Sequence, residues 1–260
     1  MKTAWLSSEV LVWNPEVQEQ IGFDAADSDR AYELLTHTDK LLALAEVDDM
    51  YLVDVVTTLK RCLSQRLKHL NRLYDFSSAP IHDRPKRLLD QLAGLNLVRP
   101  FLLQHLLEIR NAVEHEDTHP PPRQRCAELA DVVWYFLRST DSLIRRRTST
   151  FVLECPNTTS GPESPWIEVD ALGSSPWHFA FRGLIPRGIL SPEEVREWLQ
   201  LELLDELSFL RLVAEGSNIQ LPENTAAFKR ETSGNYRFFA MLVGPLSARE
   251  AISRMWAGTL

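Results

Sequence analysis

Residues 52–74 read LVDVVTTLKRCLSQRLKHLNRLY, and the spacing of their apolar side chains predicts a long amphipathic helix within residues 46–75. The apolar residues recur at steps of three and four, the period that places side chains on one face of an α-helix. They are Leu52, Val56, Leu59, Leu63, Leu67, Leu70 and Tyr74. Five basic residues fall between these positions and are expected off the apolar face: Lys60, Arg61, Arg66, Lys68 and Arg72.

Further helices are predicted on both sides of this stretch. One covers residues 29–45, and a short one covers residues 86–93, after a break that begins at Pro80. Another starts near Pro100 and is stopped by the prolines at 120–122, since a residue before proline avoids the α-helical region. The last is expected over residues 123–147. Residues 29–147 therefore form an all-α bundle in this prediction.

The pattern changes after Arg147. Short segments rich in β-branched and aromatic residues predict strands at Phe151–Glu154, Trp166–Leu172, His178–Leu184 and Tyr236–Val243. Capping signals predict helices starting at Ser191 and Ser247. The expected fold class is mainly α: a helical bundle at 29–147 followed by a smaller α+β domain at 148–260, whose role no residue indicates. Residues 1–28 are expected to be an N-terminal extension.

Composition places the chain among ordinary globular proteins. It has 260 residues, 44% of them hydrophobic, and no apolar run long enough to span a membrane. Its first twenty residues carry Glu9, Glu16 and Glu19 and do not resemble a signal peptide, so a cytoplasmic location is expected. The three cysteines are widely spaced, which excludes a disulfide framework and a cysteine-based zinc site and predicts buried, unpaired thiols.

Charge is distributed unevenly along the chain. The net formal charge is −8, yet residues 60–147 hold 16 basic and 10 acidic residues. Residues 1–59 hold 3 basic and 12 acidic residues, and residues 148–260 hold 9 and 14. The basic middle segment is either an ordinary solvated helical surface or a surface that binds a polyanion.

The segment Glu108-Ile-Arg-Asn-Ala-Val-Glu-His115 carries the strongest chemical signal. Phosphate-loop, dinucleotide-binding and nucleophile-elbow motifs are absent from the sequence. Arg110 supplies a planar, permanently charged donor fork for phosphate oxygens, and His115 has a side chain that titrates near neutral pH. These are the groups that RNA transesterification needs, because a 2′-hydroxyl must lose a proton while charge grows on the phosphate. Such a reaction needs no metal or other cofactor.

These residues resemble the R-x4-6-H motif of the HEPN superfamily, a group of helical bundles that includes many RNases. The match is Arg110-Asn111-Ala-Val-Glu-His115, and the resemblance covers residues 29–147. It implies that Arg110, Asn111 and His115 form the active site, that two bundles pair as a homodimer around one cleft, and that RNA is cut without metal. It also implies service as a toxin or antiviral defence effector, with an antitoxin or regulatory protein as a further partner.

Several alternatives stay open. Arg110 and Glu114 are spaced for a surface ion pair, and His115 is spaced for a helix-end cation, which would give these residues a structural role only. A non-catalytic HEPN module for dimerisation or for nucleotide or protein binding would carry the same Arg110 and His115. His115-Glu116-Asp117-Thr118-His119 also matches the H-E-x-x-H pattern of zinc hydrolases, although Pro120 opposes the required helix. Arg145, Arg146 and Arg147 are candidates for RNA-backbone contact, or simply for a favourable charge at a helix end.

Overall fold

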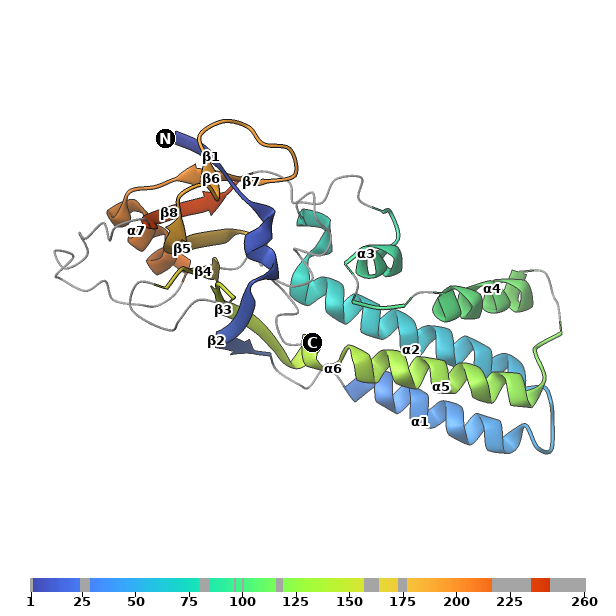
Figure 1. Ribbon diagram of the computed structural model, residues 1–260. Helices are drawn as coiled ribbons and strands as arrows, with labels where there is room; N and C mark the ends of the chain where they lie inside the picture. The colour runs from blue at the N-terminus through green and yellow to red at the C-terminus, as the bar shows by residue number, and fades with distance from the viewer. Residues whose placement is uncertain are drawn as a thin grey trace. The chain divides into compact units, whose positions relative to one another are not determined.

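The computed structural model describes residues 2–23, 29–79, 85–95, 97–99, 101–115, 119–156, 164–172, 177–216 and 235–243. Its contacts divide the chain into two compact units (Figure 1). The sheet unit comprises residues 1–21, 77–84 and 147–260, and the helical unit comprises residues 22–76 and 85–146. The first and the last strands of the described residues, near positions 2 and 242, therefore belong to the same unit.

The sheet unit is built on eight strands in the order β2-β3-β4-β5-β8-β7-β1-β6. Their bounds are β1 Lys2–Leu6, β2 Asn14–Gly22, β3 Arg146–Glu154, β4 Trp166–Ala171, β5 Phe179–Pro186, β6 Leu190–Ser191, β7 Leu199–Leu203 and β8 Asn235–Leu242. Every pairing from β3 along the sheet to β6 is antiparallel. The short 3-10 helix η1 (Ser8–Val12) joins β1 to β2.

The prediction of a mainly α protein is wrong. The large antiparallel sheet makes the chain an α+β protein, and the sheet is not a small appendage to a bundle. Residues 2–22, expected to be an extension, supply β1 and β2. Strand β1 pairs with β7, about two hundred residues later, where Ala4 faces Leu201 and Leu6 faces Leu199. Such a distant pairing leaves no local signal, because the residues that define it are not neighbours in sequence.

One face of the sheet is lined by apolar side chains from six strands. Alternate residues of a strand point to the same face, so the strand pairings show which side chains share this face. They are Ala4, Leu6, Phe151, Leu153, Ile167, Val169, Phe181, Ile185, Leu199, Leu201, Phe238 and Ala240. All twelve are buried. Gly183 of β5 allows the close approach of β4, because a Cβ there would lie 2.2 Å from the carbonyl oxygen of Trp166.

The region around Ser191 differs from its prediction. The Ser191 hydroxyl accepts a hydrogen bond from the Glu193 amide (3.1 Å), as a helix cap would, but turns and not a helix follow. The chain then enters β7, whose alternating leucines pair with β1. A helix that the sequence analysis missed, α7 (Glu206–Gly216), begins after Asp205, whose carboxylate accepts from the Ser208 amide (2.9 Å). The helix predicted at Ser247 lies outside the described residues.

The helical unit contains α1 (Asp29–Leu44), α2 (Tyr51–Tyr74), α3 (Leu88–Gly94), α4 (Phe101–His115), α5 (Arg123–Ser139) and α6 (Asp141–Arg145). The 3-10 turn η3 (Phe76–Ser78) follows α2, where the chain passes into residues 77–84 of the sheet unit. Helices α1, α2 and α5 run side by side, and α4 packs on α2 and α5 (Figure 1). Leu59, Leu63 and Leu70 of α2 are fully buried at the centre. The predicted final helix is interrupted at Thr140, and Arg146 already starts β3. No helix in the described part of the chain is long and apolar enough to cross a membrane.

Candidate functional site

The Arg110–His115 motif occupies the last described turns of α4 (Phe101–His115). Leu103, Leu106 and Val113 are buried and hold α4 against the bundle, while Asn111 is exposed. The side chains of Arg110 and His115 lie outside what the structure describes, so these two residues are placed by their backbone alone. The motif therefore sits at a helix end with one polar member on the surface.

Helix geometry separates the two principal residues. An α-helix turns by about 100° per residue, so positions 110 and 115 differ by about 140° around the axis and by about 7.5 Å along it. Position 110 lies four residues after Leu106 and three before Val113, both of them buried. Asn111 and His115 are four apart and share a helix face. Within one chain, Arg110 and His115 thus start from different sides of α4.

The zinc alternative requires a helix through both histidines, and the structure does not provide one. Helix α4 ends at His115, and His119 lies in an exposed non-helical segment. Glu116, Asp117 and Thr118 lie outside the described residues. Among the residues that are described, no three His, Cys, Asp or Glu side chains gather as metal ligands.

The three arginines proposed for RNA contact have different surroundings. Arg145 ends α6 and is exposed, with its guanidinium 4.0 Å from the Asp141 carboxylate. Arg146 begins β3 and is exposed, whereas Arg147 is only 8% exposed. A side chain with so little solvent contact has little surface to offer a phosphate, so Arg145 and Arg146 are the better placed of the three.

Sequence reasoning missed a buried ionic cluster in the helical unit. Arg66 of α2 is 1% exposed and forms a 3.0 Å ion pair with Asp141. It also donates to the Thr140 hydroxyl (3.3 Å), and its guanidinium lies over the Tyr32 ring (5.6 Å). The Tyr32 hydroxyl donates to the other Asp141 oxygen (2.8 Å). Burial and this bond to Asp141 raise the pKa of Tyr32.

We interpret the cluster as a structural element, because the charges of Arg66 and Asp141 pair with each other and have little exposure to solvent. Arg66 was expected off the apolar face of its helix. It lies three residues after Leu63 and four before Leu70, which are both buried. That spacing on an apolar stripe is the signal that a buried, paired arginine leaves in a sequence.

A shallow hollow of about 400 Å³ lies on α1 and α5. It is lined by Leu35, Asp39, Ala130, Asp131, Trp134 and Tyr135. Trp134 and Tyr135 are 42% and 67% exposed, with their rings edge to face at 4.9 Å. Two carboxylates beside aromatic rings disfavour a phosphate, so we do not expect RNA to bind there.

Comparison with known proteins gives no assignment: no family model, no curated protein and no solved structure matches this chain. The candidate site therefore depends on the residues and geometry described above.

Proposed function

We propose that this protein is a metal-independent endoribonuclease of HEPN type. The observation that carries the proposal is the position of the R-x4-H motif: it lies in the last described turns of a helix in a compact helical unit, with Asn111 on the surface. A helix end leaves backbone and side chains accessible to a long substrate such as RNA. The proposal includes a cytoplasmic role as a toxin or antiviral defence effector, under an antitoxin or another regulatory protein.

The proposed reaction assigns one task to each residue. The 2′-oxygen attacks the adjacent phosphorus as its proton passes to a histidine, the bond from phosphorus to the 5′-oxygen breaks, and that oxygen takes up a proton. The products are a 2′,3′-cyclic phosphate and a 5′-hydroxyl end. Arg110 balances the charge that grows on the phosphate oxygens, and the Asn111 amide donates a hydrogen bond to them.

A homodimer fits both the chemistry and the helix geometry. The reaction benefits from a separate proton acceptor and donor, and one chain offers only one motif histidine. Because positions 110 and 115 start from different sides of α4, an arginine and a histidine from two copies could approach one phosphate. We propose a two-fold arrangement in which two motifs share one cleft.

Cleavage of labelled RNA in EDTA tests the proposal. Wild-type protein should cut RNA and leave 2′,3′-cyclic phosphate ends, and His115→Ala should lower the rate by a factor of about 10² to 10⁴. Arg110→Lys should also lower it sharply, since it keeps the charge but loses the planar donor fork. The matched control is His105→Ala, a partly exposed histidine on the same helix, which should cut at the wild-type rate. Wild-type rates for both motif variants would refute the assignment.

The alternative is a non-catalytic HEPN module for dimerisation or for nucleotide or protein binding. The separation of about 140° between positions 110 and 115 favours it, because one chain does not bring these residues to a common face. Under this alternative, purified protein leaves RNA intact at every concentration tested.

A further inference from the structure

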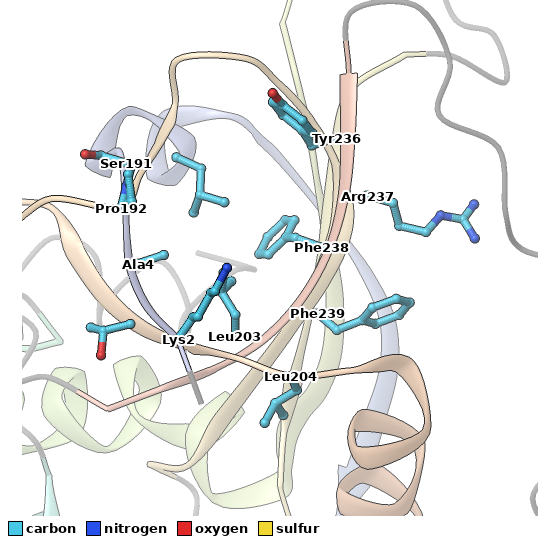
Figure 2. Close-up of a pocket in the computed structure, with 12 residues that line it drawn as sticks. Lys2, Ala4, Ser191, Pro192, Leu203, Leu204, Tyr236, Arg237, Phe238 and Phe239 are labelled. Carbon is cyan, nitrogen blue, oxygen red and sulfur yellow. The ribbon is translucent and has the colours of Figure 1, made fainter.

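The sheet unit contains a pocket at one end of its apolar face. The pocket has a volume of about 380 Å³ and is formed by β1, β6, β7 and β8 together with adjoining residues (Figure 2). This volume lies within the range of small-molecule sites in proteins, about 300–1,000 Å³. The pocket lies wholly within the sheet unit, on strands that hydrogen-bond to one another. Its walls are therefore preformed.

The inner walls of the pocket are apolar, with polar groups at the rim. Phe238 and Leu203 belong to the buried face of the sheet and point into the pocket, while Phe239 and Arg237 point away from it (Figure 2). Ala4 adds a small side chain at the base, which leaves room beside the Phe238 ring. Such walls accommodate a flat aromatic or aliphatic body.

The charge of the pocket is positive although the protein is acidic. Lys2 lines the pocket, and its ammonium group points toward Phe238 (Figure 2). Among the residues that the structure describes, no Asp or Glu lines the pocket and the Lys2 ammonium has no ion-pair partner. Glu202 precedes Leu203, so strand alternation sends it to the opposite face. Arg187 lies over the Tyr236 ring at 5.0 Å and adds a second cation near the rim.

We propose that this pocket binds a small organic anion, with its apolar body against Phe238 and Leu203 and its carboxylate or phosphate on Lys2. An ammonium beside an apolar wall selects such a molecule over a neutral or cationic analogue, because only the anion gains a charge-assisted hydrogen bond. The proposal does not depend on the nuclease activity, since all of its residues lie in the sheet unit.

Four naphthalene probes test the charge preference on the full-length protein. They are 2-naphthoate, 2-naphthyl phosphate, 2-naphthamide and 2-naphthylmethylammonium, and binding is followed by NMR shifts of the amides of Ala4, Leu203 and Phe238. We expect saturable binding of the two anions with dissociation constants of about 0.1–1 mM, as is reasonable for ligands of this size. The amide and the cation should bind about tenfold more weakly or worse. The tighter anion identifies the preferred acidic group.

Substitution of Lys2 tests the assigned cation. Lys2→Met should reduce the preference for naphthoate over naphthamide to about one, and Lys2→Arg should retain it. The matched control is Lys40→Met, an exposed lysine of α1, which should bind both probes as wild type does. An independent check on wild-type protein is ionic strength, which should weaken naphthoate binding and leave naphthamide unchanged. Equal affinity for the anions and the amide, unchanged selectivity in Lys2→Met, or no saturable shift at these amides would overturn the proposal.

Discussion

At the scale of single residues, Asp141 is the centre of a buried cluster of charged and polar side chains in the helical unit. Asp141 accepts from Arg66 and Tyr32 and lies 3.5 Å from the Arg138 guanidinium. The cluster joins α1, α2 and α6 through side chains that are far apart in sequence. A buried ion pair adds little net stability when intact, but its disruption is costly because it strands the remaining charge in a medium of low polarity.

Asp141→Ala should therefore lower the free energy of unfolding by about 3–5 kcal/mol, since it leaves the Arg66 guanidinium buried without its counter-charge. Urea denaturation measures the change. The double variant Arg66→Met/Asp141→Leu should recover most of the loss, and Arg30→Ala, which removes an exposed pair with Glu33, should change stability by no more than about 0.5 kcal/mol. If the double variant is as unstable as Asp141→Ala, the unpaired charge of Arg66 is not the cause of the lost stability.

Asp170 makes the stability of the sheet unit depend on pH. Burial, with Glu168 nearby, raises the pKa of Asp170 from 3.8 to about 6, although a hydrogen bond from Thr150 (2.9 Å) and the charge of Arg182 oppose the rise. The folded state thus binds this proton more tightly than the unfolded state. Proton binding by Asp170 therefore stabilises the folded state fully below about pH 4, and this contribution is lost as pH rises to about 6.

Asp170→Asn should remove that loss, because an amide stays neutral and its oxygen can still accept from Thr150. We expect the variant to be more stable than wild type by about 2–3 kcal/mol at pH 7.5 and similar to it at pH 4, in urea melts across that range. Asp131→Asn, an exposed carboxylate of α5, is the control and should follow the wild-type profile. A constant difference between Asp170→Asn and wild type at all pH values would contradict the titration.

At the scale of elements, β5 depends on a glycine that permits close approach. A Cβ at position 183 would meet the backbone of β4, which cannot move aside without breaking the pairing of Ile167 with Gly183. Gly183→Ala should therefore lower the free energy of unfolding by about 1–3 kcal/mol or more. Gly22→Ala is the matched control, since a Cβ there has nothing within 4 Å, and should stay within about 0.5 kcal/mol of wild type in the same urea melts.

Helix α4 shows why a motif is weaker evidence than a site. The sequence predicts that Arg110 and His115 lie near one helix end, and the described part of α4 runs to His115. Convergence of the two residues on one phosphate is a tertiary or quaternary property, because the helix itself sets them on different sides. This convergence therefore has to be tested on the assembled oligomer.

At the scale of the whole molecule, a shared cleft predicts complementation. Arg110→Ala and His115→Ala should each cleave far more slowly than wild type when alone. After unfolding and refolding together they should regain part of the wild-type cleavage, because a mixed dimer keeps one intact arginine and one intact histidine in its cleft. Light scattering should report a dimer at micromolar concentration. An active, strictly monomeric wild type, or no recovery in a mixture shown to contain mixed dimers, would contradict the shared cleft.

Local spacing in the sequence was sufficient for several elements whose signal lies within about twenty residues, although it failed at Ser191 and at α7. The leucines of residues 52–74 predicted α2, and the alternating aromatic and β-branched segments predicted β3, β4, β5 and β8, because side-chain period follows directly from backbone geometry. The same local spacing did not show which elements pair or pack with one another in the folded chain. The pairing of β1 with β7, the burial of Arg66 against Asp141, and the pocket between Lys2 and Phe238 each join residues more than seventy positions apart. Only the folded chain decides such contacts, since burial and pairing depend on the neighbours that tertiary structure supplies.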